Sequence, residues 1–170
     1  MNQHRVWSNL RTRFQINPYR KYFNLENRQR LGTSITQAER GHRGEIKIVV
    51  ETHLSLNQLS RGLTPRERAL EWFSNLRIWD TEENSGILLY LLLAERRIEI
   101  IADRGITKMV EQSAWDKICA DLQNQLAADK VIDGLCDASQ RFGDLLRQHF
   151  PQVGDSANPD ELSNEVIFIP

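Results

Sequence analysis

An oxygen-rich stretch at residues 80–86, with the sequence DTEENSG, is the part of this chain best suited to chemistry. It combines three carboxylates with three further side-chain oxygens, and the apolar run ILLYLLL follows it directly. Hard cations such as calcium and magnesium prefer oxygen ligands, and no histidine or cysteine lies within this stretch. The stretch therefore indicates either a divalent-cation site or a solvated loop that leads into a strand.

Two predicted strands and a helix determine where this stretch lies. Residues 45–51, EIKIVVE, alternate between apolar and charged side chains, which predicts a strand with one core face. Residues 87–93 are apolar on both faces, which predicts a central strand covered by helices on either side. Between the strands, Thr64, Pro65 and Glu67 form a strong helix start. This order predicts a parallel βαβ unit.

A further strand at residues 97–102 should form a hairpin with the central strand. Because the hairpin reverses the chain, its end at Asp103 and Arg104 should lie beside the start of the central strand. We therefore expect the 80–86 stretch to meet these two residues, although they are about 20 positions away in the sequence. If no metal binds, Asp80 and Thr81 are expected to cap a turn and Glu82 and Glu83 to face solvent. Asp103 is then expected to pair with Arg104 or Arg97.

The remaining segments complete a predicted α/β fold: a mixed β-sheet with a βαβ unit and a hairpin, sandwiched between helices. Helical periodicity predicts a short basic amphipathic helix within residues 3–16, a helix from Leu25 to Arg40, and two helices after Gly105. Residues 52–62 are predicted as a loop, and VIFI at 166–169 as an edge strand in this molecule or on a neighbouring one. Three regions are predicted: a basic N-terminal arm at 1–24, an α/β domain at 25–151, and a polar tail at 152–170.

Charge is unevenly distributed along the chain. Residues 1–44 carry nine Arg or Lys and two Glu, a charge of +7, whereas the remainder carries −8. The basic arm suits an anionic membrane surface, reached through residues 1–18, or packing on its own acidic domain. Nucleic acid is the less favoured partner, because the domain is acidic and shows no basic aromatic sheet face.

Several classes of protein are disfavoured by composition and motif. The chain has 170 residues, no apolar run long enough to span a bilayer and no signal-peptide pattern at its start, so a cytoplasmic protein of one main domain is expected. Cys119 and Cys136 lie on apolar faces of predicted helices, and the four histidines are scattered, which argues against zinc. The sequence contains no G-x-S-x-G, P-loop or G-x-G-x-x-G motif.

A succession of sequence blocks resembles the TPM domain family, named for a thylakoid lumen protein, a photosystem II repair factor and a modulator of a levamisole receptor. The blocks are GEIKIVVE, TPRERALEWF, WDTEENSGILLYLLLAERRIEIIADRGI, and the two following helices that end in HFP. NSGILL and ERRIEI are the most specific of them, and the resemblance covers roughly residues 25 to 151. It implies an α/β sandwich with a mixed sheet between helices.

The same resemblance implies divalent-cation binding in some members and acid phosphatase activity in plant members. Matched residue by residue, it implies calcium or magnesium ligands at Asp80, Glu83, Asn84 and Asp103. The given sequence departs from the family pattern in that it shows neither a membrane-anchor pattern nor a glycine-rich tail. The usual glycine-rich stretch after the hairpin is also reduced to three residues, 103–105.

The sequence supports two alternative functions. The first is a non-catalytic module that binds a divalent cation and a protein partner, in maintenance of membrane or protein complexes. The second is a metal-dependent phosphatase in which Asp80 and Asp103 hold the metal or activate water and Arg104 holds the phosphate. The absence of a recognisable nucleophile motif favours the first.

Overall fold

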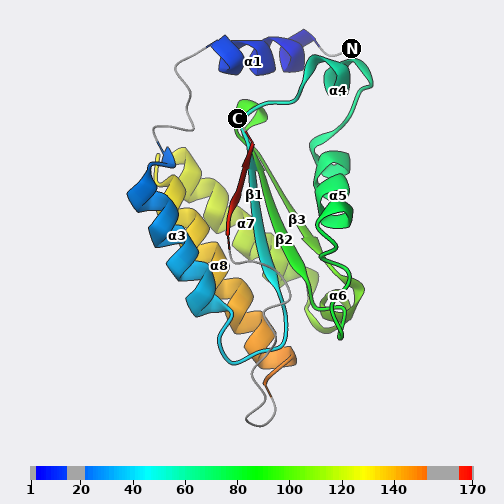
Figure 1. Ribbon diagram of the computed structural model, residues 1–170, viewed down its shortest axis with the longest axis vertical. Coiled ribbons are helices and arrows are strands. Elements are labelled where there is room, and N and C mark those ends of the chain that lie inside the picture. Colours follow the sequence, from blue (N-terminus) through cyan, green and yellow to red (C-terminus); the bar gives the residue numbers. More distant parts are fainter. Residues whose placement is uncertain (1–2, 15–21, 153–164, 170) are drawn as a thin grey trace.

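The computed structural model describes residues 3–14, 22–152 and 165–169, and Figure 1 shows helices on both sides of a central sheet. The elements in chain order are α1 (Gln3–Phe14), α3 (Leu25–Ala38), β1 (Ile46–Glu51), α4 (Leu56–Ser60), α5 (Pro65–Asn75), β2 (Ile87–Leu92), the 3-10 helix η1 (Leu93–Glu95), β3 (Arg97–Ala102), α6 (Arg104–Met109), α7 (Gln112–Ala127), α8 (Val131–His149) and β4 (Ile167–Ile169). The predicted α/β sandwich is confirmed.

The described strands form one mixed sheet in the order β3-β2-β1-β4. β1 and β2 are parallel, with Ile46 opposite Ile87, and β2 and β3 form the predicted antiparallel hairpin. β4 adds to the free edge of β1 in the parallel direction, with Val49 opposite Ile167. The C-terminal segment VIFI thus supplies an edge strand to its own sheet, one of the two alternatives that the sequence left open.

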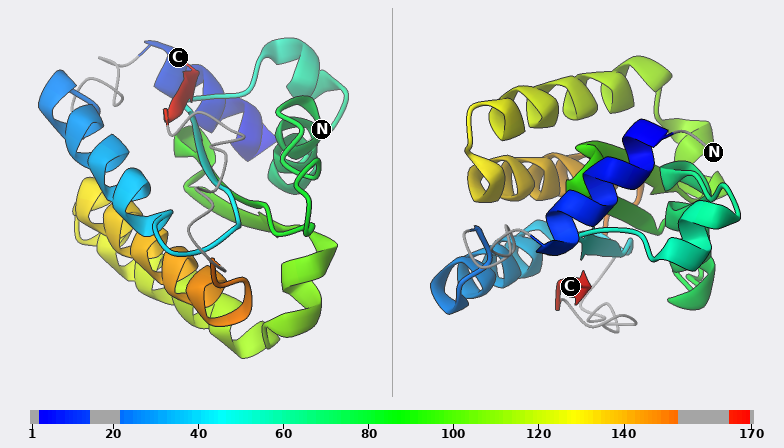
Figure 2. Two further views of the ribbon diagram at one scale, coloured as in Figure 1. Left: turned by 60° about the horizontal axis from the view of Figure 1, so that its bottom comes forward. Right: turned by 90° about the horizontal axis from the view of Figure 1, so that it is seen from above.

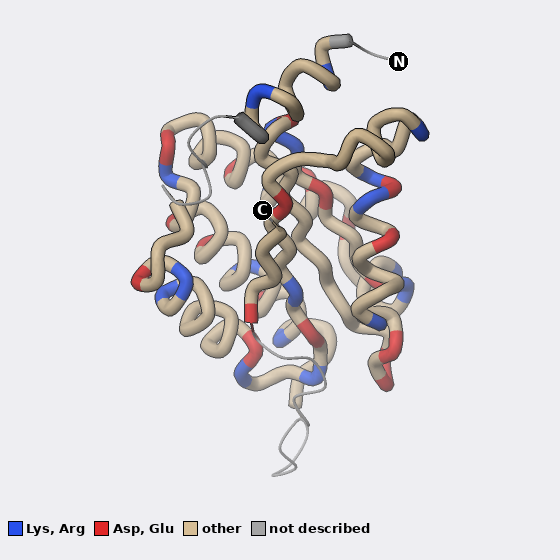
Figure 3. Tube along the Cα trace, turned by 45° about the horizontal axis from the view of Figure 1, so that its top comes forward, with Lys and Arg blue, Asp and Glu red and all other residues tan. Residues whose placement is uncertain are grey.

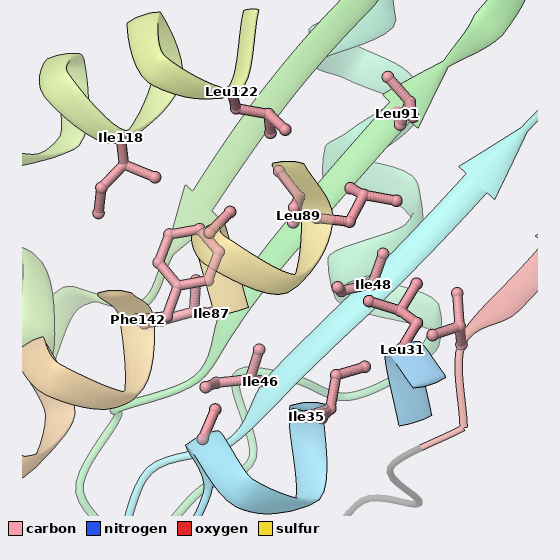
Figure 4. Close-up of a cluster of buried hydrophobic side chains, with 14 of the residues drawn as sticks. Leu31, Ile35, Ile46, Ile48, Ile87, Leu89, Leu91, Ile118, Leu122 and Phe142 are labelled. Carbon is pink, nitrogen blue, oxygen red and sulfur yellow. The ribbon is translucent and has the colours of Figure 1, made fainter. Parts of the chain in front are cut away.

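One face of the sheet packs against α3, α7 and α8. Ile46 and Ile48 of β1 and Ile87 and Leu89 of β2 point into this layer, and Phe142 of α8 enters it from the helix side (Figure 4). These side chains are at most 1% exposed. Burying this contiguous apolar surface is the main force that holds the helices on the sheet.

The opposite face of the sheet is covered chiefly by α5, with Val49 and Tyr90 among the buried strand residues. The prediction that β1 has only one core face is wrong, because all six of its residues are buried, including Lys47 and Glu51. Glu51 is tolerated there because it receives hydrogen bonds from Arg68, Trp72 and Tyr90. Burial, with the nearby Glu51 carboxylate, raises the pKa of Tyr90.

Capping side chains determine where two helices begin. Thr64 and Glu67 form the predicted capping box at the start of α5, with Pro65 in the first turn. Ser55 and Gln58 form a second capping box, which starts α4. The prediction of a loop throughout residues 52–62 is therefore wrong. The S-x-x-Q pattern was present in the sequence, but a helix of five residues has too few apolar positions to show periodicity.

The basic amphipathic helix forms as α1 and packs on its own domain, against the turn between β2 and β3. Figure 2 shows α1 crossing over one end of the sheet when the molecule is seen from above. Arg5 donates through Nε and Nη2 to the two Glu95 carboxylate oxygens, at 2.9 and 3.0 Å. The buried Asn9 side chain accepts a hydrogen bond from Leu54 N at 2.7 Å and donates to Glu95. These bonds fix the position of α1 relative to the sheet.

The two cysteines and the lengths of the helices can also be described from the structure. Cys119 and Cys136 are free thiols, both half-buried, and burial raises the pKa of each. Among the described residues, no helix combines the length and apolarity that a bilayer crossing requires.

Candidate functional site

The acidic stretch 80–86 and the end of the hairpin meet at the amino end of β2, as the topology predicted. Asp103 N donates to Gly86 O at 2.9 Å, and Gly105 N and Ile106 N donate to Asn84 O at 2.9 and 3.3 Å. The start of β1 lies at the same end, because Ile87 N donates to Glu45 O at 2.8 Å. In Figure 1 this end of the sheet carries α6 and lies opposite α1.

Local hydrogen bonds give the stretch its shape. Thr81 accepts from Asn84 N through its carbonyl at 3.1 Å and from Ser85 N through its hydroxyl at 2.9 Å. Asn84 takes a left-handed backbone conformation, with φ 54°, which asparagine tolerates better than most residues. This turn directs the Asn84 carbonyl towards the first residues of α6.

Asp103 is the most unusual side chain of the site. Its Oδ1 caps α6 by accepting from Arg104 N at 2.7 Å, while Oδ2 is buried and has no hydrogen-bond partner among the described residues. Asp103 as a whole is only 8% exposed. Leaving a buried carboxylate oxygen unsatisfied costs free energy, so this atom has a capacity for a ligand that its surroundings do not fill.

Two arginines contact side chains that were predicted as metal ligands. Glu83 forms an ion pair with Arg43, and Asn84 Oδ1 accepts from Arg104 Nε at 3.1 Å. Arg43 was not predicted as a site residue; it lies in the segment before β1, forty positions from its partner Glu83. Its positive charge was the only signal in the sequence. Of the two arginines expected as partners of Asp103, Arg104 donates its backbone N–H. No guanidinium group within the described residues contacts the other carboxylate oxygen, Oδ2.

Asp80 differs from Asp103 in being exposed to solvent. Its backbone N–H donates to Arg77 O at 2.8 Å. Within residues 3–14, 22–152 and 165–169, no three His, Cys, Asp or Glu side chains are grouped closely enough to hold a metal ion. The donors fit a hard cation in chemical type, since all are oxygens, and Asp103 supplies a buried anionic ligand. A complete ligand shell would need main-chain oxygens or water as well.

Substituting Gly105 tests whether the two loops depend on their close approach. A Cβ at residue 105 would overlap Glu83 O and lie 2.5 Å from Asn84 O, so Gly105→Ala should lower the free energy of unfolding by about 1–3 kcal/mol. Gly32→Ala is the matched control, since nothing lies within 4 Å of its added Cβ, and it should stabilise α3 by up to about 1 kcal/mol. Urea denaturation measures both, and equal effects would contradict the packing described here.

A mixed sheet between helices, with an oxygen-rich loop closed against the hairpin end, defines an α/β sandwich domain. The family model of the TPM domain matches residues 16–145, and the chain belongs to this family. The family suggested by the sequence blocks is thereby confirmed.

A solved structure supports the same fold. The chain is similar to the BA42 protein from the psychrophilic bacterium Bizionia argentinensis, whose structure was determined by NMR. The TM-score is 0.75 at 25% sequence identity, and the similarity covers 86% of this chain and 95% of that one. Among curated proteins, none matches the chain.

Proposed function

We propose that this TPM domain is a binding module that takes a divalent cation, calcium or magnesium, at the Asp103 end of the sheet and also binds a protein partner. The observation that carries the cation part is Oδ2 of Asp103, which is buried, has no hydrogen-bond partner within the described residues, and lies where the 80–86 stretch closes on α6. A divalent cation would satisfy this oxygen and neutralise the acidic stretch.

Asp103, Glu83 and Asn84 are the side chains that would hold the cation, with water completing the ligand shell and Asp80 at its outer edge. Arg43 and Arg104 engage Glu83 and Asn84, so cation and arginines compete for the same oxygens. This competition, together with the small number of carboxylates, favours weak binding, in the range of about 10⁻⁴–10⁻³ M known for low-affinity calcium modules. Calcium is the better candidate, because it accepts irregular coordination more readily than magnesium.

A titration followed by two-dimensional amide NMR tests the cation site. Calcium, and separately magnesium, should shift the amide signals of residues 80–86 and 103–106, and Asp103→Asn should abolish these shifts. Asp144→Asn is the control, because it removes one carboxylate from an exposed position on α8. If the native protein shows no shifts at a few millimolar metal, or if Asp103→Asn responds like the control, the cation proposal is wrong.

The phosphatase alternative retains one supporting observation. Arg104 is exposed at the edge of the stretch, with Nε on Asn84, where its other nitrogens could contact a phosphate. That function requires metal-dependent hydrolysis of p-nitrophenyl phosphate, lost in both Asp103→Asn and Arg104→Gln. A binding module predicts no turnover in any of these proteins, so the same assay with purified protein separates the two functions.

A further inference from the structure

We propose that the cleft beneath α1 binds an acidic, partly apolar peptide segment of a partner protein. The cleft lies between α1, the turn from β2 to β3 and the end of α7, at the opposite end of the sheet from Asp103. This inference deepens the protein-partner part of the proposed function and rests on it. It does not depend on the cation.

The size and position of the cleft fit a chain segment. Its volume is about 1730 Å³, larger than the ~300–1,000 Å³ common for small-molecule pockets. It opens at the carboxyl end of β2, next to Leu91 and Leu93, and the crevice at the carboxyl ends of parallel strands is where open α/β sheets bind ligands.

The floor of the cleft is apolar. Leu93, Ile98 and Leu126 line it, and all three are partly buried and pack against the main core. They come from η1, β3 and α7, so the floor is a surface that exists only in the folded domain. Apolar side chains of a bound segment would bury further area against this floor, which favours binding.

The rim carries an excess of positive charge. Arg11 of α1, Arg96 of the turn and Arg97 at the start of β3 line the cleft and are exposed, with no acidic partner in the part of the chain that the structure describes. The two glutamates of the lining are already paired, because Arg5 binds Glu95 and Arg66 Nη1 lies 3.6 Å from a Glu99 oxygen. Asp129 accepts a hydrogen bond from Tyr22. In Figure 3, basic positions follow α1 at this end of the molecule.

An exposed aromatic side chain completes the cleft. Trp7 of α1 is 72% exposed and lies in the lining. Tryptophan and arginine are the residues most enriched among those that dominate protein–protein binding. The bonds of Arg5 and Asn9 hold α1 in place, so the cleft is formed before any partner arrives, which reduces the entropic cost of binding.

The shape and charge distribution of the cleft favour a peptide over the other anionic partners. The apolar floor is recessed beneath α1, where a flat bilayer cannot reach it but a single chain can. A nucleic acid could answer the positive rim with its phosphates but has no aliphatic side chains to cover the floor of Leu93, Ile98 and Leu126. A segment with alternating acidic and apolar residues matches both the rim and the floor.

Fluorescence anisotropy with a labelled peptide of alternating glutamate and leucine tests this inference, in buffer with a metal chelator. The double variant Arg96→Glu with Arg97→Glu should weaken binding about tenfold or more. Arg40→Glu with Arg77→Glu is the control, since it makes the same charge change at exposed positions outside the cleft. A peptide of alternating lysine and leucine should not bind. Amide signals of residues 93–98 and 123–127 should shift on binding.

Three results would overturn the inference: no binding of the acidic peptide, equal weakening in both double variants, or binding only to phosphatidylglycerol vesicles or single-stranded DNA. The cation titration is read from residues 80–86 and 103–106, so the two proposals fail separately. A protein that binds calcium but not the peptide loses only the cleft proposal. One that binds the peptide but not calcium or magnesium loses only the cation site.

Discussion

Replacing Glu51 with alanine is expected to lower the free energy of unfolding by about 3–5 kcal/mol, because it leaves the partly buried guanidinium group of Arg68 and the buried hydroxyl of Tyr90 without their shared acceptor. Glu51 is 2% exposed and lies at the end of β1, beneath α5. Its carboxylate accepts from Arg68 Nε at 2.9 Å, from Tyr90 Oη at 2.8 Å and from Trp72 Nε1 at 3.2 Å. One substitution therefore removes the acceptor of one buried donor, Tyr90, and of two partly buried donors, Arg68 and Trp72.

Glu71→Ala is the matched control for Glu51→Ala. Glu71 also pairs with Arg68, at 2.9 Å, but its side chain is 39% exposed, so its removal should cost less than about 1 kcal/mol. Adding Arg68→Met to Glu51→Ala should restore part of the lost stability, since the partly buried Arg68 charge no longer remains without Glu51. Urea denaturation at neutral pH measures all three proteins. Similar losses for the two glutamates would show that burial of the pair is not what matters.

Phe142→Ala should be comparably destabilising, by about 3–5 kcal/mol, because it opens a cavity between α8 and the sheet. The Phe142 side chain is fully buried, points towards the strands in Figure 4, and packs on Trp115 with ring centroids 6.2 Å apart. The sheet and α7 hold the surroundings in place, so the space cannot close freely. Thermal and urea unfolding would measure the loss.

Two further variants define what an ordinary aromatic substitution costs in this protein. Phe142→Leu keeps most of the buried volume and should lose less than half as much stability as Phe142→Ala. Trp7→Ala removes a larger ring from an exposed position, and the change should stay within about 0.5 kcal/mol. If Trp7→Ala were as costly as Phe142→Ala, α1 would contribute to the core in a way that its exposure does not indicate.

Local patterns in the sequence determined most of the fold. The continuous apolar run at 87–93 identified the central strand, and the Thr64–Pro65–Glu67 capping signal identified the start of α5, because both features depend on neighbours within a few positions. The parallel βαβ unit and the hairpin followed from the order of these elements. That order also brought residues 80–86 next to Asp103, so the location of the candidate site could be derived without a structure.

Only the tertiary structure decided which charged groups meet. Alternation in EIKIVVE placed Glu51 on a polar face, but α5 covers that face and supplies Arg68, seventeen positions away. Tertiary contacts likewise bring Arg43 to Glu83 and leave Oδ2 of Asp103 without a partner among the described residues. The cleft beneath α1 likewise needs three separate segments in place. Side-chain pairing across elements depends on distances that local periodicity does not encode, whereas strand and helix formation depends on the periodicity itself.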